Sequence, residues 1–150
     1  MAGRMLSQHA AGVHRIAYTC STKQKMVTNA KRARGVEAYQ NGLAAEDIVC
    51  QKLRGAGWKV LLQRARTRRG EIDIVAQNGT TISFIEVKLR KTLRDAAESL
   101  SATQSRRLFR AAECLLQSNP HWQYEELRFD LFILDANSKM EWLKDVIRQM

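Results

Sequence analysis

The fold of this chain is decided by residues 71–89, which read EIDIVAQNGTTISFIEVKL. Runs rich in isoleucine and valine lie on both sides of Asn78-Gly79. This dipeptide is the strongest short-range hairpin signal, because both residues of a type I′ turn need a positive φ. The stretch therefore predicts two antiparallel strands, Glu71–Gln77 and Thr80–Leu89.

The register of the hairpin decides which side chains share a face. We expect Gln77 to pair with Thr80. Glu86 then lies opposite Glu71 and diagonal to Asp73. Because side chains alternate across a strand, one face carries Glu71, Asp73, Val75, Ile82, Phe84, Glu86 and Lys88. The other face, which we expect to be the main core face, carries Ile72, Ile74, Ala76, Thr81, Ser83, Ile85, Val87 and Leu89.

The acidic face has the composition of a metal site. Diagonal neighbours lie roughly 7–8 Å apart at the backbone, so Asp73 and Glu86 can reach one ion. A hard divalent ion with oxygen ligands, Mg²⁺ or Mn²⁺, suits them. Lys88 shares the face, where its ammonium can stabilise developing phosphoryl charge or orient the attacking water. The alternative is a solvated face on which Lys88 balances one carboxylate. That alternative is favoured for a single Glu-x-Lys pattern and weakened by the clustering with Asp73.

A third carboxylate lies on the helix expected over Glu37–Arg54. Glu46 falls in line with Val49, Cys50 and Leu53, and this stripe should face the sheet. A carboxylate on a core-facing stripe is costly unless it is paired or bound to a metal. The alternative is a glutamate at the edge of the stripe that reaches solvent or pairs with a lysine.

The remaining elements complete an α/β pattern. A capping box, Ser101 with Gln104, begins a helix that ends near Ser118. The other expected segments are a strand over 58–62, a basic connection over 63–69, a buried strand over 127–134, a turn over 135–138, and a strand or helix over 140–146. The order helix, three strands, helix, strand predicts a mixed sheet flanked by helices.

Basic residues cluster at the end of the hairpin opposite its turn. This arrangement suits a nucleic-acid backbone, which cations hold while acids hold the metal. The candidate contacts are Arg64, Arg66, Arg68, Arg69, Arg90, Lys91 and Arg94. For a further trio on the later helix, Arg106, Arg107 and Arg110, we favour a solvated face.

Charge and length bound the class of protein. The 150 residues predict one domain, and a net charge of +10 favours a polyanionic partner. Residues 1–36 hold seven basic residues and no acidic ones. We interpret 1–35 as a flexible basic arm and 36–150 as the folded domain. An organellar transit peptide, or a true start at Met26, is the alternative for the arm.

Cysteine usage and hydropathy indicate the compartment. Cys20, Cys50 and Cys114 are scattered, which fits neither a zinc site nor a disulfide framework and favours a reducing cytoplasm. No stretch approaches the roughly 18 consecutive apolar residues of a membrane helix. We therefore expect a cytoplasmic protein without a membrane partner.

Four segments together resemble a known family. These are GLAAE (42–46), RGEIDIV (69–75), FIEVKLR (84–90) and RRLFRAA (106–112), and they resemble the bacterial YraN-like family. That family is similar to archaeal Holliday-junction resolvases within the PD-(D/E)xK nuclease superfamily. The resemblance implies a restriction-endonuclease-like fold and Mg²⁺-dependent phosphodiester hydrolysis by Glu46, Asp73, Glu86 and Lys88. Gln104-Ser105 stands where the family commonly has a Lys-Gln pair, so no role is carried over for that lysine.

The leading hypothesis is a metal-dependent endonuclease acting on DNA, on branched or damaged structures. Asp73 and Glu86 would hold the metal, Glu46 would complete its shell, and Glu71 is a candidate for an outer position. Junction resolution needs two sites related by symmetry, so we expect a homodimer. The alternatives are a non-catalytic nucleic-acid-binding protein on the same fold and, less favoured, an assembly factor.

Overall fold

The computed structural model describes residues 14–90, 100–137 and 139–147, and the chain divides into two units, 1–40 and 41–150. The first helix begins well before the expected Glu37. Its early part has no apolar stripe but contains no proline and many good helix formers, so propensity rather than periodicity marks it. The flexible arm stays a prediction.

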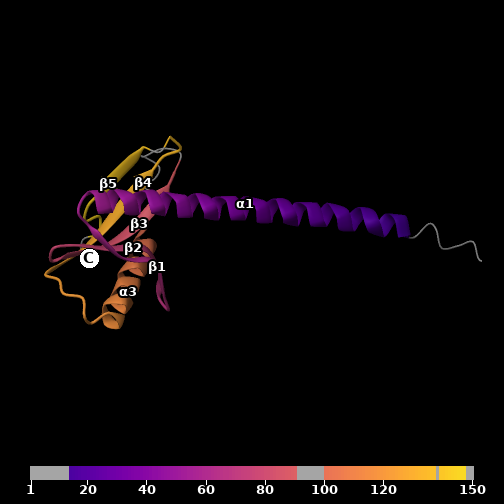
Figure 1. Cartoon of the computed structure of the whole chain (residues 1–150). Coiled ribbons are helices and arrows are strands. Elements are labelled where there is room, and N and C mark those ends of the chain that lie inside the picture. Colours follow the sequence, from indigo (N-terminus) through magenta and orange to yellow (C-terminus); the bar gives the residue numbers. More distant parts are fainter. Residues whose placement is uncertain (1–13, 91–99, 138, 148–150) are drawn as a thin grey trace, which may run out of the picture. The chain divides into compact units, whose positions relative to one another are not determined.

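In chain order the elements are α1 (His14–Gly55), β1 (Lys59–Thr67), β2 (Gly70–Asn78), β3 (Thr81–Leu89), α3 (Ala102–Ser118), β4 (Glu126–Leu134) and β5 (Met140–Leu143) (Figure 1).

The five strands form one mixed sheet in the order β1-β2-β3-β4-β5. β3 and β4 are parallel and joined through α3, whereas the other neighbours are antiparallel. The predicted α/β class is confirmed, and so is the capping box at Ser101, whose side chain accepts from the Gln104 N–H at 3.2 Å. The last element, left open by the sequence, is the short strand β5. None of the helices within the described residues is both long and apolar enough to cross a membrane.

Two details of the first three strands differ from the sequence prediction. The expected basic connection over 63–69 is wrong, because β1 continues to Thr67. Asn78 pairs with Thr81, so the predicted Gln77–Thr80 pairing is also wrong and the turn residues are Gly79-Thr80. Gly79 alone of the expected turn pair takes a positive φ, 59°. The shift is two residues, so Asp73 rather than Glu71 comes into line with Glu86. The predicted alternation holds for Ile82, Phe84 and Ile85. It is wrong for Ile72, which was grouped with Ile74 but packs with Val75 on the other face.

Both faces of the sheet are buried, not only the one predicted as the main core face. The part of α1 after Asn41 packs Val49 and Leu53 against Ile74 and Ile85. On the opposite face α3 packs Ala111, Ala112 and Leu115 against Val75, Ile82 and Phe84. A parallel β3–β4 pair with its crossover helix requires such cover on both sides.

The β1–β2 ladder has a bulge between Val60 and Leu62, and the alternation of side chains fails again at Arg64. Gln63 and Arg64 are consecutive, yet both reach α1: Gln63 Nε2 donates to Asp47 Oδ1 and Arg64 Nε donates to Glu46 Oε2, each at 3.0 Å. Arg64 has a φ of 54°, the left-handed region. Pairing runs from Gln63–Ile74 to Ala65–Ile72 and skips the Arg64–Asp73 step between them.

The same break is visible in the packing of β2. Ile72 and Val75 both belong to the cluster under α3, although three residues separate them. Ile74 belongs to the cluster under α1. An irregularity that places one residue in the left-handed region re-aims the side chains beside it. The break therefore changes the direction of the side chains in this part of β1 and β2, including that of Asp73.

The left-handed conformation at Arg64 predicts an inverted ranking of two substitutions. Asparagine tolerates this conformation, whereas for a β-branched residue it is a genuine outlier. Ordinary strand propensity would instead favour valine. Both Arg64→Asn and Arg64→Val remove the guanidinium from Glu46, so their difference isolates the backbone. We expect Arg64→Val to be the less stable by roughly 1–2 kcal/mol in urea denaturation. If Arg64→Val were as stable as Arg64→Asn, or more stable, the assigned left-handed conformation would be contradicted.

Candidate active site

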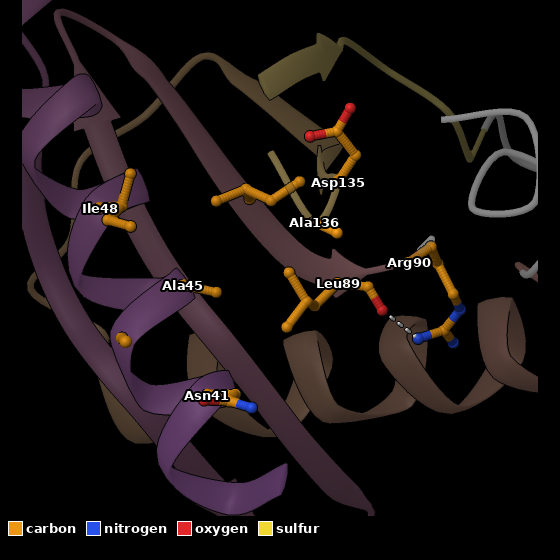
Figure 2. Close-up of a pocket in the computed structure, with 9 residues that line it drawn as sticks. Asn41, Ala45, Ile48, Leu89, Arg90, Asp135 and Ala136 are labelled. Atoms are coloured by element: carbon orange, nitrogen blue, oxygen red, sulfur yellow. Dashed lines mark hydrogen bonds between the residues drawn. The ribbon is translucent and has the colours of Figure 1, made fainter. Parts of the chain in front are cut away.

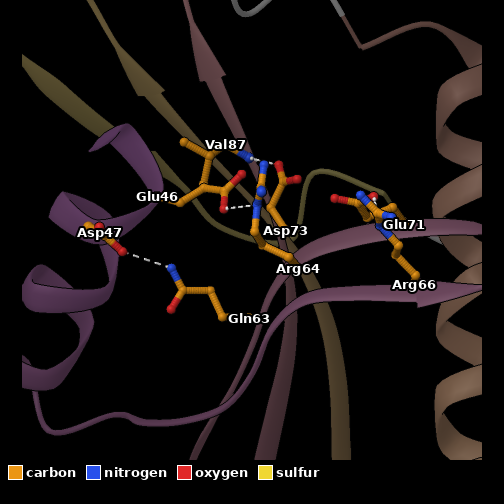
Figure 3. A network of polar contacts seen from close by, with 8 residues as sticks. All are labelled: Glu46, Asp47, Gln63, Arg64, Arg66, Glu71, Asp73 and Val87. Carbon is orange, nitrogen blue, oxygen red and sulfur yellow. Dashed lines mark hydrogen bonds and ion pairs between the residues drawn. The ribbon is translucent and has the colours of Figure 1, made fainter. Parts of the chain in front are cut away.

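Asp73 is fixed where β2 and β3 stop pairing. The regular ladder between these strands ends at Ile74–Ile85. One step beyond, the Asp73 carboxylate takes the place of a backbone acceptor: the Val87 N–H donates to Asp73 Oδ2 at 2.8 Å (Figure 3). A carboxylate tied to a strand N–H has little freedom to turn away. Burial, its largest influence, raises the pKa of Asp73, and this hydrogen bond partly opposes the rise.

Glu86 meets Asp73 across this opening. The two carboxyl groups lie close enough for each to shift the pKa of the other. Burial first, and then the negative charge of Asp73, raise the pKa of Glu86 from 4.5 to about 7. The sequence placed these two acids on one face, and the structure brings them into direct contact. When both are ionised, two half-buried acids this close repel one another unless a cation lies beside them.

Lys88 is the cation of this group. Its Nζ lies 3.2 Å from Glu86 Oε1, and the side chains of Lys88 and Glu86 are only 12% and 19% exposed. The ammonium is one of the influences that lower the pKa of Glu86, yet the net shift stays upward because burial outweighs it. The alternative of a solvated face therefore does not describe these residues. Lys88 stands half-enclosed beside the acid pair, with its charge directed at it.

Glu46 faces the sheet, as its place on the helix stripe predicts. The residue is 6% exposed, and its carboxylate accepts from Arg64 at 3.0 Å (Figure 3). Burial, followed by the charge of Asp73, raises its pKa, and Arg64 acts in the opposite direction. The structure thus gathers Glu46 into the electrostatic field of Asp73 and gives it a guanidinium partner. Its role as a metal ligand stays a prediction.

Glu71 is not opposite Glu86, so that part of the predicted register is wrong. Its side chain is 38% exposed and pairs with Arg66 at 3.2 Å. The two-residue shift of the hairpin is the physical reason. Glu71 acts on the site through its charge alone, which contributes to the raised pKa values of Glu46 and Asp73.

Two carboxylates, rather than three, are in position for a cation. Among the residues that the structure describes, no three His, Cys, Asp or Glu side chains lie close enough to hold one ion together. Mg²⁺ is usually held in proteins by one or two carboxylates, and water and substrate phosphate supply its other ligands. The neighbouring carboxyl groups of Asp73 and Glu86 provide this donor set. The residues therefore fit a divalent ion that shares its ligands with a substrate.

The predicted basic contacts divide into separate groups. Arg64 and Arg66 are turned to Glu46 and Glu71, whereas Arg68 and Arg69 lie exposed in the β1–β2 turn. Arg90 borders a hollow of about 480 Å³ between α1 and the ends of β3 and β4, where its guanidinium donates to the Leu89 carbonyl at 2.8 Å (Figure 2). Lys91 and Arg94 lie outside the described residues.

Another buried acid, Asp130, is part of the framework rather than of this site. Asp130 on β4 is 2% exposed and accepts two hydrogen bonds from Arg128, at 2.8 and 2.9 Å. The Trp142 indole and the Asp145 N–H also donate to it, at 3.0 and 2.9 Å. With both oxygens doubly engaged, Asp130 joins β4 to β5 and the chain that follows. The sequence did not predict this network, because an aspartate two residues after an arginine on a buried strand does not show which groups it will contact.

Two features of the site were missed by sequence reasoning. The Val87 N–H that fixes Asp73 is a backbone donor, and no side-chain pattern reveals it. Arg64 was placed among the nucleic-acid contacts, yet it is the residue whose left-handed backbone interrupts the ladder. Arginine is not a residue that favours this conformation, so its identity gave no warning.

The fold and site define a class of protein. The mixed sheet lies between α3 and the part of α1 after Asn41, an α/β arrangement consistent with a restriction-endonuclease-like fold. The chain belongs to the family described as Uncharacterised protein family UPF0102, the YraN-like family, whose sequence model matches residues 45–134.

Curated relatives agree with this assignment. A UPF0102 protein of Granulibacter bethesdensis is 39% identical over 118 residues, which cover 79% of this chain and 75% of the relative. One from Azorhizobium caulinodans is 40% identical over 113 residues, covering 75% and 86%. One from Acidiphilium cryptum is 43% identical over 111 residues, covering 74% and 86%. The similarity includes the whole region from Glu46 to Lys88 in the family match.

The raised pKa of Glu86 predicts that the metal-free protein loses stability as pH rises. Between pH 4.5 and about 7 the folded protein keeps this proton while the unfolded chain releases it. The stabilisation is therefore complete below pH 4.5 and lost above about 7, at most roughly 3 kcal/mol. Urea denaturation across this range in chelator should show the decline.

Two variants isolate the carboxyl group responsible. Glu86→Gln cannot ionise and should make the decline smaller, leaving the part due to the raised pKa values of Glu46 and Asp73. Glu71→Gln, at an exposed position, should leave the decline in place. Parallel profiles for the wild type and Glu86→Gln would show that another group is responsible.

Proposed function

We propose that this protein is a divalent-metal-dependent endonuclease that hydrolyses phosphodiester bonds in DNA. The observation that carries the proposal is the pairing of Asp73 with Glu86, beside the Lys88 ammonium at 3.2 Å from Glu86. Two half-buried acids that shift the pKa of each other form a site that one cation can occupy. A lysine in the same small space adds positive charge directed at the bound group.

Each residue of the site has a separate task. Asp73 and Glu86 hold Mg²⁺ or Mn²⁺, with Asp73 kept in place by the Val87 N–H. The ion, when bound, supplies Lewis-acid polarisation of the phosphoryl oxygen and lowers the pKa of water. Lys88 donates to the phosphoryl oxygens as their charge increases, or orients the attacking water. Glu46 accepts from Arg64 and keeps that guanidinium beside the acids.

The substrate class follows from charge and resemblance. The net charge of +10 favours a polyanion. Similarity to junction resolvases favours branched or damaged DNA within that class. On a four-way junction, two cuts related by symmetry need two active sites, so we expect a homodimer to be the active form there.

One observation favours a second candidate, a non-catalytic nucleic-acid-binding protein on the same fold. The acid on α1 is neutralised by Arg64 rather than joined to the other two, and no three-acid group forms among the described residues. A protein that only binds DNA needs no acids among its cations, whereas here Asp73 and Glu86 are retained at a cost in buried charge. This is why the nuclease is the first proposal.

Cleavage assays separate the two candidates. Linear, flapped and four-way DNA are incubated with Mg²⁺ and with Mn²⁺, and the purified variants are compared with the wild type. We expect Asp73→Asn and Lys88→Gln each to lower the cutting rate at least roughly 100-fold while DNA binding persists, since each removes a group that acts in the transition state.

The matched control is Glu71→Gln, which removes a nearby carboxylate outside the acid pair and should cut at close to the wild-type rate. Equal cutting by all variants would identify a contaminating nuclease. DNA binding without any cutting by the wild type would establish the second candidate.

A further inference from the structure

A groove lies between the β1–β2 turn and one side of α3. It consists of two adjoining hollows, of about 430 and 240 Å³, that share Arg68, Arg69 and Arg110. α3 lines it with residues three and four apart, a spacing that keeps them on one side of the helix. These residues are Thr103, Arg106, Arg107, Arg110, Glu113, Cys114 and Gln117. The helix thus turns an arginine-rich side toward the turn and its apolar side to the core.

The arginines are held on a braced framework. Thr67 Oγ1 donates to the Gly70 carbonyl at 2.7 Å and accepts from the Arg69 and Gly70 N–H groups at 3.1 Å. Gly70 itself receives the stem of Arg107, because a Cβ added at Gly70 would lie 3.0 Å from Arg107 Cγ. The turn is therefore fixed from within and packed against α3, so Arg68 and Arg69 face the helix arginines before any ligand arrives.

The charge of the groove is strongly one-sided. Five arginines line it, and Glu113 is its one acidic lining residue. Within the described part of the chain, none of the five forms an ion pair with a carboxylate. Like charges held together repel one another unless an anion joins them. Guanidinium groups match phosphate oxygens with two parallel hydrogen bonds, which makes a phosphodiester chain the fitting anion.

We propose that this groove binds the sugar-phosphate backbone of duplex DNA beside the bond that is cut. The sequence favoured a solvated face for Arg106, Arg107 and Arg110, and their place opposite the turn changes that interpretation. From Gly70 to Asp73 the strand advances three residues, about 10 Å. Roughly three phosphates of one DNA strand occupy that length of duplex. The position of the cut rests on the proposed function, whereas binding in the groove does not require cutting.

Salt-dependent DNA binding tests the groove without any cleavage. The affinity of the full-length protein for a fluorescein-labelled DNA duplex is measured in chelator over a range of salt concentrations. Arg106→Gln/Arg110→Gln should lower the slope of log affinity against log salt by about 2, because each phosphate that the protein no longer neutralises reduces it by about 0.9. The control pair Lys52→Gln/Arg54→Gln removes the same charge from the exposed side of α1 and should change the slope little.

Further arms separate phosphate recognition from general charge. Arg106→Lys/Arg110→Lys should keep most of the slope but lose affinity, since lysine cannot form the two parallel hydrogen bonds of a guanidinium. Equal losses in the groove pair and the control pair would overturn the proposal, as would displacement of the duplex by polyglutamate as efficiently as by unlabelled DNA. Wild-type cutting with an unchanged slope in the groove pair refutes the groove alone. A reduced slope without any cutting by the wild type refutes the nuclease alone.

Discussion

The site depends on an interruption of the β1–β2 ladder at Arg64 and Asp73. With Arg64 in the left-handed region, Gln63 and Arg64 both turn to α1, and the pairing step at Asp73 is lost. Asp73 is then available to accept from the Val87 N–H and to meet Glu86. A regular ladder would engage these backbone groups with one another and would leave no opening in which a ligand could reach both acids.

The opening collects more negative charge than the protein itself neutralises. Arg64 compensates Glu46, and Lys88 lies beside Glu86, yet burial still raises the pKa of Glu46, Asp73 and Glu86. Burying carboxylates without full compensation is unfavourable, so such an arrangement persists when it serves another purpose. A divalent cation at the acid pair would remove the deficit, and the arginine groove along α3 would add positive charge for the rest of a bound phosphodiester chain.

Much of this could be predicted from the sequence because it follows from periodicity. The strand pair, the sheet-facing Glu46 and the cap at Ser101 arise from local patterns, and the structure has them. The exceptions have tertiary causes. The observed register differs from the predicted one by two residues because Asn78 belongs to the ladder instead of the turn. The left-handed conformation of Arg64 cannot be recognised from the residue type. The groove was missed because the spacing of its arginines on α3 does not say what faces them.

Manganese binding tests the central claim, that the interrupted ladder brings Asp73 and Glu86 together as one cation site. The protein is treated with chelator, exchanged into chelator-free buffer and titrated with Mn²⁺ in a calorimeter. We expect one bound ion for each chain in the wild type and in Glu71→Gln. Asp73→Asn and Glu86→Gln should each abolish that binding while both proteins remain folded by circular dichroism. Mn²⁺ binding of wild-type affinity in either of these two variants would contradict the account.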